Sequence, residues 1–149
     1  MTVRLVGPPR NAGLPEIDAG QLRSRARGVL KALGHTRSEL SVALVDDAEM
    51  RELNGAWRGK PRPTDVLAFS MLEGEGTEHR RRLLGDVVIS VETARRQARA
   101  RHRGLEEEVT RLLIHGTLHL LGFDHVRSAD ARDMRAEERR LFRAVRDDA

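Results

Sequence analysis

Residues 115–125 read HGTLHLLGFDH and hold three of the six histidines in the chain. His115 and His119 are four residues apart, so on a helix they project from the same face, one turn above the other. Gly122 is the residue type that accepts a positive φ, so we expect it to end the helix and to let the chain bring His125 back toward the other two histidines. Three imidazoles with an open side are a common ligand set for a catalytic zinc ion, which keeps water in its fourth position. The stretch therefore predicts a zinc site on a helix that the surrounding leucines place in the core.

The same spacing, His-Gly-x-x-His-x-x-Gly-x-x-His, occurs in zinc proteases with one difference. Those enzymes carry a glutamate directly after the first histidine as the general base, whereas this chain has Gly116 at that position. A bound metal could still acidify its water, but the carboxylate that takes the proton during peptide attack is absent. Peptide hydrolysis is therefore disfavoured. A purely structural zinc is the better alternative, although it normally needs a fourth protein ligand, for which Asp124 is adjacent.

Hydrophobic periodicity and turn-forming residues predict the other elements. We expect strands at residues 3–6, 40–45, 65–69 and 85–91. We expect helices that open at Asp18 and at Asp46, a helix over about 92–102, one from 106 into the histidine stretch, and one over 130–146. This order predicts one α+β domain over residues 1–149, with a small mixed four-stranded sheet packed against about five helices.

Two of these expectations bear on the site. The helix that opens at Asp46 should end near Leu53, because Asn-Gly follows it, and residues 57–65, WRGKPRPTD, should then form a basic loop. The strand at 65–69 is mostly apolar, which predicts a central place in the sheet.

Composition limits the chemistry and the partners. The chain has 149 residues, a formal net charge of +4 and no cysteine, so only His, Asp or Glu can hold a metal. Its basic residues are almost all arginine, which suits bidentate contact with the phosphates of RNA or DNA, although genome codon bias can produce the same excess. Aromatic residues make up only 3%, so base stacking should not dominate any RNA contact. With no apolar run long enough for a signal peptide or a membrane span, we expect a cytoplasmic protein without a membrane partner.

Several motifs together resemble a known family. The histidine stretch, TDVLAF at 64–69, GDVVIS at 85–90, and Leu-Asn at 53–54 leading to WRGK at 57–60 occur in the order that is typical of the YbeY family of bacterial metal-dependent endoribonucleases. The resemblance runs from about residue 40 to the end of the chain. Trp57 and Phe123 depart from it slightly, because tyrosine-like residues are usual at both positions.

The resemblance implies a fold, an activity and site residues. The fold would be α+β with a four-stranded sheet and surrounding helices. His115, His119 and His125 would bind one Zn²⁺ per chain. The activity would be cleavage of single-stranded RNA in small-subunit ribosomal RNA maturation and ribosome quality control, with components of the small ribosomal subunit as partners. Arg58 would be the functional arginine near the cleft.

Physical chemistry agrees with a role for Arg58, since phosphodiester cleavage develops negative charge that a guanidinium can pair. Lys60 and Arg62 are candidates to extend a phosphate-binding strip. The acidic and hydroxyl residues at strand starts and the arginine run are expected to be structural or solvent-exposed; they are Thr64, Asp65, Asp86 and residues 80–82.

Three hypotheses remain open from the sequence. The first is the zinc-dependent endoribonuclease, in which no general base is evident: Asp124, substrate groups or the RNA 2′-hydroxyl could fill that role, and either water or the 2′-hydroxyl could attack. The second is a non-catalytic ribosome-assembly factor with a structural zinc. The third is a metallopeptidase-like hydrolase. The sequence predicts no oligomeric state.

Overall fold

The computed structural model describes residues 1–7, 13–71, 82–123 and 128–146. Over these ranges the chain forms, in order, β1 (Thr2–Val6), α1 (Ala19–Ala32), β2 (Glu39–Val45), α2 (Asp47–Arg58), β3 (Val66–Ser70), β4 (Leu83–Ser90), α3 (Val91–Ala100), α4 (Leu105–Leu120) and α5 (Ser128–Val145). None of the helices described is both long and apolar enough to cross a membrane.

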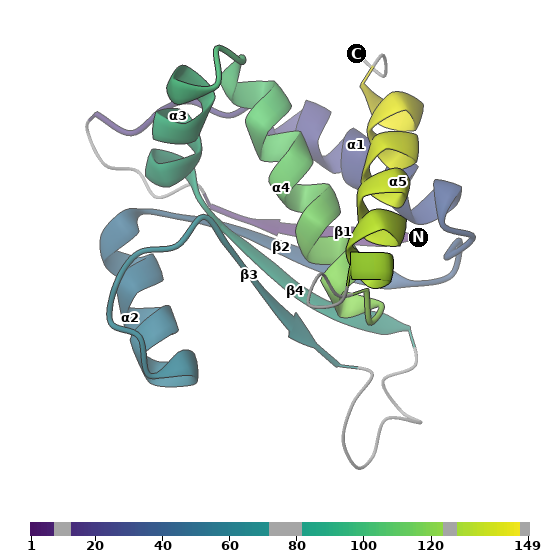
Figure 1. Cartoon of the computed structure of the whole chain (residues 1–149), viewed down its shortest axis with the longest axis horizontal. Coiled ribbons are helices and arrows are strands. Elements are labelled where there is room, and N and C mark those ends of the chain that lie inside the picture. Colours follow the sequence, from purple (N-terminus) through teal and green to yellow (C-terminus); the bar gives the residue numbers. More distant parts are fainter. Residues whose placement is uncertain (8–12, 72–81, 124–127, 147–149) are drawn as a thin grey trace.

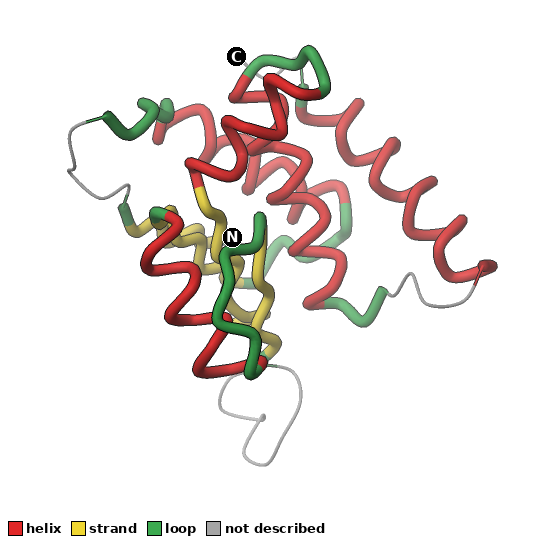
Figure 2. The backbone as a smooth tube through the Cα atoms, turned by 60° about the vertical axis from the view of Figure 1, so that its left-hand side comes forward, coloured by secondary structure: helices red, strands yellow, loops and turns green. Residues whose placement is uncertain are grey.

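The strands form one mixed sheet in the order β1-β2-β4-β3. β1, β2 and β4 run parallel, and β3 pairs antiparallel with β4. Helices α1, α3, α4 and α5 lie over one face of the sheet, and α2 lies alone on the other face (Figures 1 and 2). The predicted α+β fold with a four-stranded mixed sheet and five helices is therefore confirmed.

Helix α4 is the centre of the helical layer, as the leucines around the histidines predicted. It packs on β3 and β4 and contacts α1, α3 and α5. Its apolar side chains are almost fully buried; they include Leu112, Leu113, Ile114, Leu118 and Leu120. The helix that carries the histidine motif is thus held rigidly by contacts on several sides.

Helix α5 covers the outer side of α4. Met134, Leu141 and Val145 are buried in one cluster with Ile114 of α4, and Phe142 stacks under the guanidinium of Arg111, 4.0 Å from its ring centre. These side chains form the apolar face by which the terminal helix packs on α4. This packing also brings Glu138 of α5 near His115 in the C-terminal half of α4.

Strand β3 lies at the edge of the sheet, so the prediction of a central strand was wrong. Its apolar sequence is explained by cover on both faces. Val66 and Ala68 pack toward α4 in the main core cluster, while Leu67 and Phe69 pack in the cluster that also contains Met50 of α2. In the described part of the chain no strand pairs with the outer edge of β3, and this edge borders the cleft described below.

Helix α2 also differs from the prediction, because it continues past Asn54 and Gly55 to Arg58. The Asn54 side chain is buried and donates a hydrogen bond from Nδ2 to the Arg62 carbonyl at 2.9 Å. Gly59, with a φ of 67°, ends the helix instead. Trp57 and Arg58 therefore stand on the last turn of a helix and not in a loop, which gives their side chains a defined direction.

Asp47 fixes the other end of α2 to the sheet. Its carboxylate accepts hydrogen bonds from Ser90 Oγ at 2.6 Å and Thr93 Oγ1 at 2.7 Å, and Arg96 adds an ion pair at 2.8 Å. Burial raises the pKa of Asp47, but the hydrogen bonds from Ser90, Arg96 and Thr93 outweigh burial and hold the pKa below its ordinary value. The ionised carboxylate thus anchors α2 to β4 and α3, and so positions Arg58.

Candidate active site

His115 and His119 lie on the C-terminal half of α4 and face each other, as their spacing predicted. Their Nε2 atoms are 3.1 Å apart, and their rings meet edge to face with centres 4.6 Å apart. Both side chains are half-buried. The motif therefore places two imidazole nitrogens at one point beside the sheet.

The end of α4 has the geometry that Gly122 was predicted to provide. Gly122 has a φ of 92°, its N–H donates to the His119 carbonyl, and the Phe123 N–H donates to the Leu118 carbonyl, both at 3.1 Å. This pair of bonds is a Schellman motif, supported by the packing of Phe123 in the same cluster as Leu118. The chain leaves α4 at this turn; Asp124 and His125, the predicted third ligand, lie outside the described residues.

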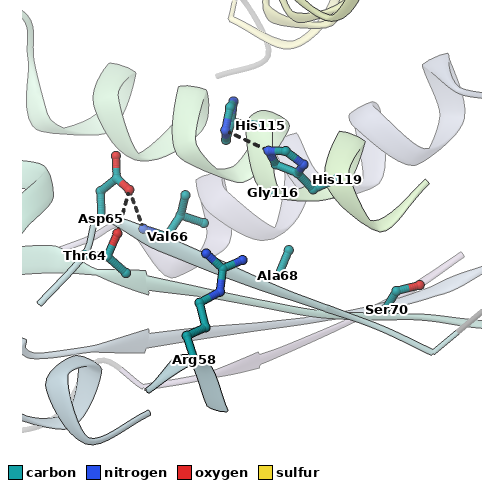
Figure 3. A pocket seen from close by; sticks show the side chains of 9 residues that line it. All are labelled: Arg58, Thr64, Asp65, Val66, Ala68, Ser70, His115, Gly116 and His119. Atoms are coloured by element: carbon teal, nitrogen blue, oxygen red, sulfur yellow. Dashed lines mark hydrogen bonds between the residues drawn. The ribbon is translucent and has the colours of Figure 1, made fainter. Parts of the chain in front are cut away.

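Arg58 points toward the histidines from the helix on the opposite side of the sheet. It is exposed on the last turn of α2, and within the described part of the chain its guanidinium makes no hydrogen bond or ion pair. In Figure 3 the side chain rises past the strand and points its guanidinium toward the space between β3 and the two histidines. The open edge of β3 allows this crossing, since another strand at that edge would block it.

A cleft of about 460 Å³ joins these groups. It is lined by His115, Gly116 and His119 of α4, by Val66, Ala68 and Ser70 of β3, and by Arg58, Thr64 and Asp65 (Figure 3). The three β3 residues alternate along the strand, so all point to the α4 face. The cleft therefore has an apolar floor with polar groups at both sides.

Asp65 lines the cleft but is occupied by structural bonds, as predicted. Its Oδ1 accepts from the Val66 N–H at 2.8 Å and from Thr64 Oγ1 at 3.4 Å, and its Oδ2 accepts from Gln97 Nε2 at 3.2 Å. The carboxylate thus caps the start of β3 and ties it to α3. These bonds make it a poor candidate for a general base.

Gly116 lies where α4 presses directly on the sheet. A Cβ at this position would come within 2.7 Å of Val87 Cγ1 and 3.2 Å of Val66 Cγ2. Both neighbours are β-branched and stiff, and Val87 is fully buried. A glutamate, the protease general base, therefore does not fit here unless α4 moves away from the sheet.

We predict that Gly116→Ala destabilises the fold by about 1–2 kcal/mol, because overpacking outweighs the gain of roughly 1 kcal/mol in helix propensity. Gly20→Ala is the matched control: Gly20 is exposed in α1, and its Cβ would meet only Asp18 Oδ1 at 3.5 Å. In urea unfolding, the free energy of unfolding should fall for Gly116→Ala and rise slightly for Gly20→Ala. A Gly116→Ala protein as stable as the wild type would contradict the close packing.

Glu138 of α5 is a further charged group beside the histidines. Its Oε1 lies 3.6 Å from Nδ1 of His115, and both side chains are 32% exposed. Nδ1 is the ring nitrogen on the far side from the Nε2 that faces His119. Glu138 was not predicted from the sequence, because it lies 23 positions from His115 on a separate helix and no spacing rule connects the two.

Other predicted residues are not part of this cleft. Lys60 and Arg62 are exposed in the segment after α2 and do not line it. Arg82 lies at the start of β4, where its carbonyl accepts from the Glu39 N–H; the rest of the arginine run, residues 80 and 81, lies outside the described residues. Ser70 was missed by the sequence analysis: its Oγ donates to the Leu120 carbonyl at 3.3 Å and joins β3 to the end of α4.

The donor set fits a zinc ion as far as it is described. Two nitrogen ligands of a tetrahedral zinc, each about 2.0–2.1 Å from the metal, lie roughly 3.3 Å apart, close to the 3.1 Å between the two Nε2 atoms. The described residues alone do not assemble three ligating side chains. The pair would therefore supply two of the three ligands that an open zinc site needs.

The fold and the cleft define a single-domain α+β protein whose cleft sets an arginine opposite a pair of imidazoles on a buried helix. A family model described as endoribonuclease YbeY matches residues 12–146, and the chain belongs to this family. It is 49% identical over 145 residues to the endoribonuclease YbeY of Anaeromyxobacter sp. (strain Fw109-5), covering 97% of this chain and 72% of the relative.

Further relatives agree with this assignment. The endoribonuclease YbeY of Anaeromyxobacter dehalogenans is 51% identical over 85% of this chain and 64% of its own length. That of Aquifex aeolicus is 50% identical over 78% of this chain and 71% of its own. The solution structure of a Thermotoga maritima protein superposes with a TM-score of 0.67 at 26% identity, covering 97% of this chain and 89% of that one. The family resemblance drawn from the motifs is confirmed.

Proposed function

We propose that the chain is a zinc-dependent endoribonuclease specific for single-stranded RNA, and that residues 1–149 act as one metal-dependent domain. Its biological role would be maturation of small-subunit ribosomal RNA and ribosome quality control in the cytoplasm. The observation that carries the proposal is the cleft in which Arg58 faces His115 and His119. Family membership supports RNA as the substrate, since the relatives are named as endoribonucleases.

In this proposal three histidines bind the metal. His115 and His119 present Nε2 from a rigid helix, and His125 completes the set after the turn at Gly122. A zinc ion held there supplies Lewis acidity toward a phosphoryl oxygen or toward water. A site with His125 as its third ligand keeps a fourth position for water or substrate, which is typical of catalytic zinc, whereas structural zinc is normally closed by four protein ligands.

Arg58 acts on the substrate phosphate. Its guanidinium can pair two phosphoryl oxygens, and these gain negative charge as the phosphodiester is cleaved. The side chain has no competing partner in the described part of the chain. Arg58 therefore does not have to break an ion pair within the protein in order to bind a phosphate. Lys60 and Arg62 follow on the same exposed segment and bind flanking phosphates in this proposal.

Glu138 orients the first ligand. Its carboxylate beside Nδ1 favours the His115 tautomer that keeps the proton on Nδ1, which leaves the Nε2 lone pair for the metal. We predict that Glu138→Gln weakens zinc binding by roughly 10- to 100-fold, measured by competition with a chromophoric chelator. Glu137→Gln is the control, because Glu137 pairs with Arg140 on the same helix. Equal zinc affinities of the two variants would show that Glu138 does not contribute to metal binding.

The direct test of the function uses purified zinc-loaded protein with single-stranded RNA, the matching RNA duplex and casein. The proposal requires cleavage of the single strand while the duplex and casein stay intact. Casein cleavage would restore the peptidase hypothesis, and a zinc-loaded protein that cuts none of the three would favour the assembly-factor hypothesis. Product ends identify the nucleophile, since a 2′,3′-cyclic phosphate requires attack by the 2′-hydroxyl.

A further inference from the structure

Trp57 is the most exposed large apolar side chain in the described part of the chain. It is 70% exposed, compared with 56% for Val6 and 42% for Met1. It is also the only tryptophan in a chain without tyrosine. A single exposed apolar residue needs no special explanation by itself, so the inference depends on how this ring is held and what surrounds it.

The indole is fixed in orientation against the sheet. Its ring lies edge to face with Phe69, with centres 5.7 Å apart and an angle of 62° between the planes. Phe69 is packed in the core cluster beneath α2. Trp57 itself stands on the last turn of a helix that Gly59 terminates. A ring that is pinned at one edge and otherwise open is ready to accept another flat group without losing much side-chain freedom.

Trp57 does not line the cleft itself, but it adjoins residues that do. It directly precedes Arg58, which lines the cleft, and its partner Phe69 lies on β3 between Ala68 and Ser70, which line it too. Phe69 and the indole lie on the α2 face of β3, whereas Ala68 and Ser70 face α4, so the edge of β3 separates the indole from the cleft floor. A polymer that enters the cleft over this edge passes Trp57.

The charges around Trp57 fit a polyanion. Arg58, Lys60 and Arg62 are all exposed on the same short segment, and none of them forms an ion pair within the described residues. An aromatic face next to several cations is the combination by which proteins bind single-stranded nucleic acid: cations contact phosphates while bases stack on the ring.

We infer that Trp57 is a base-stacking subsite for the nucleotide next to the phosphate held by Arg58. The inference rests on the proposed function and deepens it, because a duplex keeps its bases stacked on one another and offers none to the indole. Trp57 thus contributes to the preference for single strands. The scarcity of aromatic residues is consistent with one stacked base instead of a row of them.

The test exploits the single tryptophan, which alone supplies the intrinsic emission. Wild type is titrated with a single strand of about 12 nucleotides, made with 2′-O-methyl and phosphorothioate linkages to slow cleavage, and with an abasic strand of equal charge. The same strand carries a dye, so that anisotropy reports binding independently. Binding is then compared for Trp57→Ala, Trp57→Phe and the control Val6→Ala. Val6 is exposed on β1, at the opposite edge of the sheet.

We expect the base-bearing strand to quench Trp57 emission and the abasic strand to leave it unchanged. Trp57→Ala should weaken binding roughly 5- to 100-fold, Trp57→Phe should recover most of the loss, and Val6→Ala should have no effect. Binding seen by anisotropy without quenching, together with unchanged affinity of Trp57→Ala, would overturn the stacking subsite and leave the nuclease proposal intact. A wild type that neither binds nor cuts RNA would overturn both.

Discussion

Replacing His119 with alanine is expected to abolish tight zinc binding and to reduce RNA cleavage at least about 1,000-fold, while the protein stays folded. The site would keep at most two of its three nitrogen ligands. Metal catalysis contributes several kcal/mol to stabilising a transition state, and each 1.36 kcal/mol is a factor of ten in rate. A loss of this size therefore follows from losing the metal alone.

The fold should survive because α4 is held by other side chains. The side chains of Leu113, Ile114 and Leu118 are at most 1% exposed, whereas His119 is half-buried at the cleft. Alanine also has a higher helix propensity than histidine. The metal should thus be separable from the core, unlike the zinc of small domains that unfold without it.

Three measurements on matched protein preparations decide the outcome: bound zinc by elemental analysis, thermal unfolding, and cleavage of single-stranded RNA. His102→Asn is the control, because His102 is exposed and its φ of 54° suits asparagine. Loss of zinc together with loss of the fold would assign a structural metal. Cleavage that persists in His119→Ala would identify a contaminating nuclease and remove the activity from this protein.

Replacing Arg58 with alanine is expected to lower kcat by about 100- to 1,000-fold, the usual cost of removing one donor that stabilises developing negative charge. Arg58→Lys should retain part of the activity, since an ammonium keeps the charge but cannot form the paired bonds of a guanidinium. Stability should change little, because the side chain is exposed and has no partner in the described residues.

Steady-state kinetics distinguish transition-state stabilisation from simple attraction of RNA. A drop mainly in kcat supports charge stabilisation during cleavage, whereas a rise in KM alone would make Arg58 a binding residue only. Arg99→Ala is the control for net charge, because Arg99 is also exposed, on the last turn of α3, and does not line the cleft. An effect of Arg99→Ala as large as that of Arg58→Ala would show that total charge and not position matters.

Much of the helix that carries His115 and His119 could be predicted from the sequence, because the rules that form it are local. The four-residue spacing of His115 and His119 determines that they share a helix face. Gly122 was expected to take a positive φ, and it does so in a motif closed by bonds spanning only a few residues. The α+β fold was also predictable, since hydrophobic periodicity distinguishes strands from helices.

Local rules failed where contacts distant in sequence decide the structure. The Asn-Gly pair at 54–55 predicted a helix end, but the buried Asn54 side chain is satisfied by the Arg62 carbonyl, so the helix continues to Arg58 and Gly59 caps it. The apolar β3 was predicted to be central, but an edge strand can be equally apolar when helices cover both of its faces.

The sequence by itself therefore determined the pair of imidazoles, the turn that follows it, and the absence of a protease general base at Gly116. Only the tertiary structure decided that β3 lies at the open edge, that Arg58 crosses that edge to face His115, and that Glu138 approaches from α5. It also gave the reason for Gly116, which is the close contact of α4 with Val87. The difference is physical: helix periodicity acts over a few residues, whereas the cleft is formed by residues as far apart as Arg58 and His119, 61 positions along the chain, which only the packed core brings together.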